Sequence, residues 1–384
     1  MQLFEQILDC YGWWGVSLIG VIFMLFCVQL YYYLYAYGRL PGYKNNRRKP
    51  LMEQEPPLSV IVPMFSEDCT FVEERLPLIL AQNYHEFEVI IVYVGNDRDF
   101  YDDLERLRQS FPQIYVTKIH FDARFPISRK MALNVGIKSA HHECMVFTST
   151  NAMPQTDRWL SLIAKGFTRG EVVVGYCGLE QQEGVASYLM RTSRMMHSVA
   201  WLSRAVLRRP YRGTLHNMGF TKTSYYRVNG FGNLNMNIGE DDLFLQQVMT
   251  RENVSVVLSP RATLREKQWG KMGWWHNQQR YYCSSYPLYP LGAKNFVEWE
   301  AGSRLLFFLA IVCALVVLPV ELKLVAGLLL LTRYLLVVIQ VRRIANRLGE
   351  QGVVWRYFLY DLISPIWDAG VRISLFYKDK RVWR

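Results

Sequence analysis

The feature that most constrains this chain is an uncharged, apolar run over residues 13–37, which reads WWGVSLIGVIFMLFCVQLYYYLYAY. About 20 such residues are enough to cross a bilayer as a helix. Tryptophans lie at one end of the run and tyrosines at the other, as in the aromatic belts of membrane proteins. The acids Glu5 and Asp9 precede it, whereas a signal peptide begins with basic residues. Residues 1–40 are therefore predicted to form an N-terminal transmembrane helix.

A second apolar zone covers residues 305–341 and is interrupted by a proline and charged residues at 319–323. This pattern predicts two spans, over 305–320 and 324–341, which together form a transmembrane hairpin over 304–342. We therefore expect transmembrane helices toward both ends of the chain, with a soluble part between them.

Basic residues mark one side of these spans. None precedes the first run, but they follow it in a basic linker, residues 41–56, and they flank both ends of the hairpin. The positive-inside rule then places the N-terminus outside and the soluble part in the cytosol of a multi-pass inner (plasma) membrane protein. Residues 343–384 predict an amphipathic, basic tail at the interface, with a fourth span as the alternative. Arg333 lies inside the hairpin, where a charge is costly, so we expect a functional site, snorkelling or a bound lipid phosphate.

The net charge is +11, from 44 basic and 33 acidic residues. This excess fits a surface of membrane lipids or a ligand that carries phosphate. Nucleic acid is not an expected partner, because the sequence has no nucleic-acid-binding motif. The seven cysteines form no C-x-x-C pair, which argues against a zinc site or a disulfide framework.

The soluble part alternates strand patterns with helical patterns. Strands are predicted at 58–63, 87–94, 114–119, 144–148 and 171–177, and helices at 71–82, 128–141, 157–169 and 184–208. Such alternation implies βαβ units and a mainly parallel sheet. Ligands of these sheets bind at the carboxyl ends of the strands. The loops after Val62, Val94 and Thr148 are therefore expected to line one pocket.

The stretch GEDDLFLQQVM (239–249) places three acids at the start of an apolar helical pattern. On a helix, Asp241 shares one face with Phe244 and Val248, so it is predicted to point inward, and Asp242 to point outward. A buried carboxylate needs a partner or a chemical role. From these residues alone, Asp241 is either a helix cap or a catalytic acid or base.

Six stretches occur in the order found in a known enzyme family: PLSVIVPMFSED, RKMALNVGIKSA, FTSTNAMPQTDRWL, TLHNMGFTKTSYYRVNGFG, GEDDLFLQQV and WWHNQQRYY. Over residues 57–285 and the flanking spans, the chain resembles membrane-bound family 2 glycosyltransferases such as cellulose and hyaluronan synthases. The resemblance implies an α/β fold of the GT-A type, which binds a nucleotide-sugar, over residues 57–260. Residues 261–303 would then form an amphipathic interface region that carries the NQQRY motif.

The resemblance also assigns roles to residues near the acceptor. Asp241 matches the family's general base, which takes the proton of the attacking acceptor hydroxyl while the sugar's anomeric centre is inverted. Acceptor-binding residues by the same resemblance are His216, Asn217, Glu240 and Tyr281. Tyr281 stands where the family has a tryptophan that stacks on sugar, although an interfacial aromatic belt explains the same stretch.

Donor-binding residues implied by the resemblance are Pro63, Phe65, Glu67, Gly95, Lys130, Ser149, Asn151 and Arg280. Arg280 matches the arginine of the family's Q-x-x-R-W motif and would neutralise the leaving diphosphate. Lys130 matches a lysine near the nucleotide, with a solvated helix residue as the alternative. Glu67 belongs to a loop that holds the base and ribose, with a helix cap as the alternative.

The chain departs from the family where a metal is usually held. The D-x-D motif lines up with Ser149, Thr150 and Asn151, and a strand-end V-D-D-G-S lines up with residues around Gly95. Mg²⁺ and Mn²⁺ prefer carboxylates, so this D-x-D is degenerate. Three alternatives follow: a weak metal site through Asn151, Asp97 or Asp99, a metal-free site in which Lys130 and Arg280 supply the charge, or an inactive site.

Two functions are therefore open. The first is an inverting glycosyltransferase that moves a sugar from a nucleotide-sugar to a lipid-linked or glycan acceptor. The second is an inactive pseudo-glycosyltransferase that acts as a subunit or sensor of a complex for glycan synthesis or export. Three spans are too few to enclose a sugar chain, so an oligomer or a glycan-export partner would have to complete a pore, or the additions would be short. A dinucleotide-binding oxidoreductase is excluded because no G-x-G-x-x-G follows the first strand.

Overall fold

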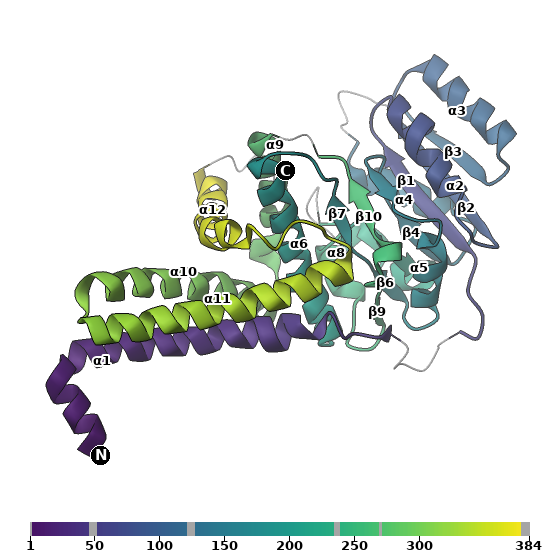
Figure 1. Cartoon of the computed structure of the whole chain (residues 1–384). Helices are drawn as coiled ribbons and strands as arrows, with labels where there is room; N and C mark the ends of the chain where they lie inside the picture. Colours follow the sequence, from purple (N-terminus) through teal and green to yellow (C-terminus); the bar gives the residue numbers. More distant parts are fainter. Residues whose placement is uncertain (1, 46–51, 121–126, 234–238, 269–270, 378–384) are drawn as a thin grey trace.

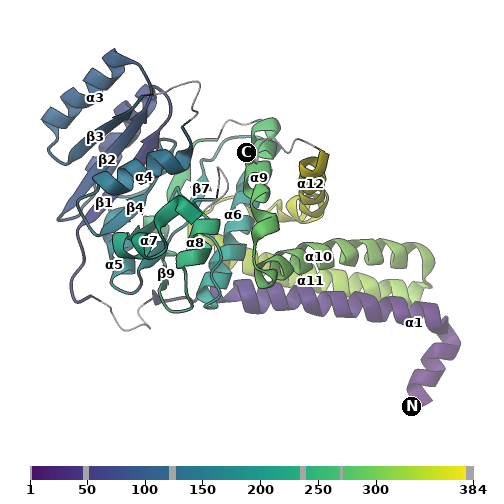
Figure 2. The ribbon, with the colours of Figure 1, turned by 180° about the vertical axis from the view of Figure 1, so that it is seen from behind.

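The computed structural model describes residues 2–45, 52–120, 127–233, 239–268 and 271–377. Figures 1 and 2 show an α/β domain from which a bundle of three long helices projects, with the N-terminus at the far end. The bundle consists of α1 (Gln2–Leu30), α10 (Leu291–Val317) and α11 (Val320–Leu348). An α/β fold with long apolar helices is therefore confirmed.

Three segments of the described chain are long and apolar enough to cross a membrane, namely Gly12–Arg39, Leu291–Val317 and Val320–Leu348. They correspond to the three predicted spans, but α10 begins well before the predicted start at residue 305. Pro290 precedes the helix and no proline interrupts it, so the helical backbone continues through residues that the resemblance assigned to an interface region. Hydropathy marks the apolar part of a helix and not its ends.

The main sheet has seven strands in the order β3-β2-β1-β4-β8-β6-β9. Their bounds are β1 Leu58–Met64, β2 Phe87–Val94, β3 Ile114–Ile119, β4 Cys144–Phe147, β6 Val172–Val174, β8 Met218–Thr221 and β9 Val254–Val256. β1 runs parallel to β2 and β4, β2 runs parallel to β3, and β8 runs antiparallel to both of its neighbours. The predicted mainly parallel sheet is confirmed.

The strand predicted over 171–177 is in fact two short strands, β6 and β7 (Cys177–Leu179). β7 joins a second sheet of order β5-β10-β7, with β5 at Ala152–Pro154 and β10 at Leu264–Glu266. The break falls at Gly175, where a Cβ atom would come within 2.7 Å of the Asn217 side chain. A residue with a side chain would collide there, so glycine fits at the break between the two strands.

Helices cover both faces of the main sheet. α4 (Arg129–Ser139) packs on one face, while α2 (Leu76–Leu80), α3 (Arg98–Ser110) and α5 (Trp159–Phe167) pack on the other. Alternate strand residues supply the two cores, since side chains along a strand point to opposite faces. Gly136 lets α4 approach β1 closely, because a Cβ atom there would lie 2.6 Å from Ile61. This close approach holds α4 against the face of the sheet.

Three helices fill the space between the α/β domain and the bundle: α6 (Val185–Val206), α9 (Met272–Ser284) and α12 (Tyr357–Tyr377). α12 packs on α6, α9 and α10. It carries exposed apolar side chains, including Leu362 and Ile366, as the predicted amphipathic tail requires. The basic end of that tail lies outside the described residues.

Arg333 neither snorkels nor faces lipid. Its side chain is fully buried and its guanidinium donates to both carboxylate oxygens of Asp361 on α12, at 2.6 and 3.2 Å. It also donates to Gln29 on α1 at 3.0 Å. The charge is costly to bury but is matched by an opposite charge, so it connects α1, α11 and α12. The sequence could not show this, because Asp361 lies on another helix.

Breaking this pair should destabilise the protein strongly. Asp361→Leu leaves the Arg333 guanidinium buried without its counter-charge, which typically costs about 3–5 kcal/mol. The double variant Arg333→Met with Asp361→Leu removes both charges and leaves Arg304, which also faces Asp361 at 3.5 Å, with Glu300 as its partner, so it should recover part of that loss. Thermal unfolding of the detergent-solubilised proteins measures both. A double variant as unstable as Asp361→Leu alone would show that the unpaired charge of Arg333 is not the source of the loss.

Candidate active site

A cavity of about 390 Å³ opens at the carboxyl ends of β1 and β4, where the topology of the sheet predicts a ligand site. Its volume lies in the range of about 300–1,000 Å³ that is usual for small-molecule sites. Its wall is formed by the loops after β1 and β4, the start of α4, the segments before β8 and α8, strand β10 and helix α9. The lining residues include Pro63, Phe65, Arg129, Thr148, Ser149, Asn151, His216, Asp241, Glu266, Trp274, Tyr281 and Tyr282.

Ser149, Thr150 and Asn151 lie in this cavity, where the resemblance placed the degenerate D-x-D. The Ser149 hydroxyl and His216 Nδ1 are hydrogen-bonded at 2.8 Å. Burial lowers the pKa of His216 to about 4, so the ring is neutral at pH 7. Within the described residues, the buried Thr148 hydroxyl makes no hydrogen bond. This side of the cavity therefore offers neutral oxygen donors.

These residues do not fit a divalent metal. Across the described chain, no group of three or more His, Cys, Asp or Glu side chains is placed to hold an ion. Asp97, which was a candidate ligand, instead caps α3 by accepting from the Phe100 amide at 3.0 Å. Hard cations prefer several carboxylates, and Ser149, Thr150 and Asn151 supply none.

Asp241 is buried at the mouth of α8 (Leu243–Val248), as the sequence pattern predicted. Arg212 approaches its carboxylate at 3.5 Å. Burial raises the pKa of Asp241 to about 7, and the Asp242 charge adds to that rise while Arg212 opposes it. A carboxyl group with such a pKa exchanges protons near neutral pH, as a general acid or base must.

Asp242 does not point outward, contrary to the prediction. It is buried and serves as the N-cap of α8, where it accepts from the Leu243 amide at 2.6 Å. Its second oxygen accepts from Tyr289 at 2.6 Å and from Ser285. The helical projection fails because the helix begins only at Leu243, so Asp242 has non-helical backbone angles. Asp242 therefore holds the start of α8, and Asp241 is the acid that faces the cavity.

Two further acids lie close by, and each has a fixed partner. Glu266 pairs with Arg194 at 2.9 Å. Burial opposes its charged form, but His216 and Arg194 together keep the pKa of Glu266 below its usual value. Glu240 is buried behind the cavity wall and accepts from the Tyr281 hydroxyl at 3.1 Å. Sequence reasoning missed Glu266 and Arg194, because no motif contains them.

Several predicted site residues do not line the cavity. Glu67 accepts a hydrogen bond from the Tyr93 hydroxyl at 2.6 Å, which holds it beside the strand next to Gly95. Lys130 and Arg280 lie on α4 and α9 but outside the wall, and their neighbours Arg129 and Tyr281 line it instead. The positive charge on this side of the cavity is therefore that of Arg129 and not that of Lys130.

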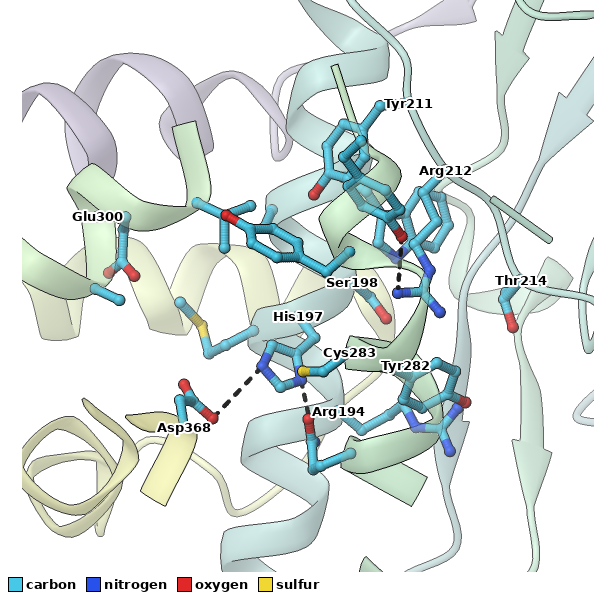
Figure 3. A pocket seen from close by; sticks show the side chains of 18 of the residues that line it. Arg194, His197, Ser198, Tyr211, Arg212, Thr214, Tyr282, Cys283, Glu300 and Asp368 are labelled. Atoms are coloured by element: carbon cyan, nitrogen blue, oxygen red, sulfur yellow. Dashed lines mark hydrogen bonds and ion pairs between the residues drawn. The ribbon is translucent and has the colours of Figure 1, made fainter. Parts of the chain in front are cut away.

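A second, largely aromatic cavity of about 140 Å³ adjoins the first, and Tyr282 lines both. It lies where α6 and α9 meet α10 and α12, and Figure 3 shows its polar residues. Within it His197 faces Asp368 at 3.9 Å. Burial raises the pKa of Asp368 to about 6 and lowers that of His197 to about 3. Sequence reasoning missed this cavity because its residues come from four helices and from several segments outside them that lie far apart in the sequence.

Asn217 and His216 are expected to respond differently to substitution. Asn217 is fully buried, accepts from Trp159 at 3.0 Å and donates to the Tyr176 and Ala262 carbonyls. Asn217→Ala leaves these groups unpaired, so unfolding free energy should fall by about 1–3 kcal/mol per lost partner. His216→Ala, at the cavity wall, should cost less. Denaturant unfolding of both variants tests the assignment, and equal losses would contradict it.

Comparison with known proteins gives the fold and a family. The family model described as glycosyl transferase family 21 matches residues 19–384. No curated protein matches the sequence. Among solved structures, the mannosyltransferase PcManGT of Pyrobaculum calidifontis, in complex with GDP-Man and Mn²⁺, is 17% identical with a TM-score of 0.54. The match covers 91% of this chain and 99% of that one, so the two share a fold.

A second solved structure is a fragment of TarS from S. aureus in complex with UDP-GlcNAc, at 15% identity and a TM-score of 0.42. The match covers 79% of this chain and 92% of that one. The prediction of a glycosyltransferase is confirmed by the family model. The narrower placement beside cellulose and hyaluronan synthases of family 2 stays a prediction.

Proposed function

The chain belongs to glycosyl transferase family 21, and from this premise we propose that it transfers a sugar from a nucleotide-sugar to an acceptor hydroxyl with inversion. The observation that carries the proposal is a buried Asp241, with a raised pKa, at the wall of a cavity at the carboxyl ends of the strands. A family 21 chain with this arrangement has a base where an acceptor hydroxyl would lose its proton.

The proposed reaction is a single displacement. The acceptor oxygen forms a bond to the anomeric carbon, the bond from that carbon to the diphosphate breaks, and the nucleoside diphosphate leaves. The proton of the acceptor hydroxyl passes to the Asp241 carboxylate, which must lie within hydrogen-bond reach of it. Phe65 and Pro63 lie in the same cavity and would contact the donor. Tyr281 offers a flat ring for the sugar.

We propose a lipid-linked acceptor because of the second cavity. Its wall is mostly aromatic and apolar, and Glu300 and Arg304 of the apolar helix α10 contribute to it. Tyr282 connects it to the cavity that contains Asp241. An acceptor that lies in the bilayer could place its apolar part here and its hydroxyl toward Asp241. The basic residues after the first span support a cytosolic face for both cavities.

Asp241→Asn should lower the rate of sugar transfer by about 10²–10⁴-fold, because an amide cannot accept the proton. Nucleotide affinity should stay nearly unchanged, because the base acts on the acceptor. The measurement is sugar transfer into membranes by purified protein, with calorimetric nucleotide binding alongside. Asp103→Asn, at an exposed ion pair on α3, is the matched control and should have native activity. Native activity in the Asp241 variant would show that Asp241 is not the base and has only a structural role.

The pH profile of transfer should follow the same residue. The folded-state pKa of Asp241 is raised to about 7, so the carboxylate needed as a base is present above that pH and is lost below it. The rate should therefore rise between about pH 6 and 8 and then level off, as expected for one essential base. A rate that is flat across this range, with chemistry rate-limiting, would contradict the assignment.

The lost D-x-D carboxylates favour a second candidate, an inactive subunit or sensor of a glycan complex. The two candidates differ in whether the intact protein turns over a donor. Hydrolysis or transfer of a sugar from a panel of nucleotide-sugars supports the enzyme. Binding of a nucleotide-sugar without any turnover, in the presence of membrane extract as acceptor source, would support the sensor.

A further inference from the structure

We propose that the guanidinium of Arg129 binds the diphosphate of the donor in the place where a divalent metal would otherwise lie. The proposal rests on the proposed function, because that function supplies the nucleotide-sugar. It assigns this role to Arg129 instead of the neighbouring Lys130, which the resemblance selected. It also makes donor binding independent of metal.

The first observation is that the carboxylates in the cavity already have arginine partners. The two carboxylates that line it, Asp241 and Glu266, already face Arg212 at 3.5 Å and Arg194 at 2.9 Å. A metal would have to compete with these guanidinium groups for its ligands. At the strand end where family members place a D-x-D, Ser149 and Asn151 offer only neutral oxygens. The donor set of this cavity therefore suits a phosphate better than a cation.

The second observation is the position of Arg129. It is the first residue of α4, an 11-residue helix whose N-terminus is capped by Ser128 accepting from the Met131 amide. Its side chain lines the cavity and remains 43% exposed. In the described part of the chain, its guanidinium has a long ion-pair contact of 3.9 Å to Glu240 and lies 5.7 Å from the Tyr281 ring. These contacts orient the guanidinium and leave donors for a ligand.

The third observation is a buried hydroxyl that has no hydrogen-bond partner among the described residues. It belongs to Thr148, which is 1% exposed and lines the same cavity. A buried polar group in this state is unfavourable unless a ligand completes it. A phosphate oxygen would accept from this hydroxyl while the guanidinium of Arg129 donates two parallel hydrogen bonds. The positive end of α4 adds to the attraction for an anion.

The test is calorimetry of the full-length protein in detergent with UDP and with GDP, each in EDTA and in Mn²⁺. We expect at least one nucleotide to bind with the same affinity, within about twofold, in both conditions. Arg129→Ala should weaken binding at least about tenfold, which corresponds to losing a hydrogen bond to a charged group. Arg129→Lys should also weaken it, because an ammonium cannot bind phosphate bidentately. Arg106→Ala, at an exposed ion pair on α3, is the control and should bind normally.

Each outcome decides something. Binding that EDTA abolishes and Mn²⁺ restores overturns the proposal but leaves the proposed function standing. Native affinity in a folded Arg129→Ala protein also overturns it, and Arg129→Lys decides the matter if the alanine variant does not fold. No binding of either nucleotide or of their sugar conjugates in any condition defeats the proposed function itself. Ser149→Asp combined with Asn151→Asp places two carboxylates in the same cavity, so nucleotide binding should weaken in EDTA and recover in Mn²⁺. Native affinity of that variant in EDTA would count against the cavity as the diphosphate site.

Discussion

The junction between the layers of this protein depends on carboxylates that are buried there and paired with arginine. The clearest case is Glu350, which follows the end of α11 and accepts from Arg191 on α6 at 2.9 Å. It also pairs with Arg265 on β10 and accepts from Tyr176 at 2.6 Å. A buried charge without such partners is expensive. This one residue therefore connects the end of the apolar hairpin to α6 and to β10.

The same constraint separates structural acids from the candidate base. Glu266 has Arg194 at 2.9 Å, and its pKa lies below the usual value despite burial. Asp241 has Arg212 only at 3.5 Å, and burial raises its pKa. Neighbouring acids whose environments move their pKa values in opposite directions are typical of catalytic sites. A tighter contact with Arg212 would keep Asp241 ionised at lower pH and would make it a weaker base.

The sequence predicted what depends on local pattern and missed what depends on where an element begins. The strands over 87–94 and 114–119 are confirmed, and the first of them is largely buried, because strand patterns are a local signal. Asp242 was misplaced because the helix starts at Leu243, two residues later than the projection from Asp241 assumed. Motif order pointed to Lys130, yet the start of α4 at its Ser128 cap places Arg129 in the cavity. Such differences of one or two residues decide function but leave periodicity unchanged.

No sequence motif indicated Arg212, although its charge opposes the rise in the pKa of Asp241, the proposed base. Its guanidinium lies 4.5 Å from the ring of Tyr282, which lines both cavities, and 3.5 Å from Asp241. It also donates to the Tyr289 hydroxyl, which in turn donates to the Asp242 carboxylate. These contacts fix the position of the Arg212 guanidinium, so it is not free to move toward a bound nucleotide-sugar. Under the proposed function, the charge of the incoming diphosphate is therefore bound by Arg129, which lines the cavity that contains Asp241. Arg212 lines the second cavity and opposes the rise in the pKa of Asp241.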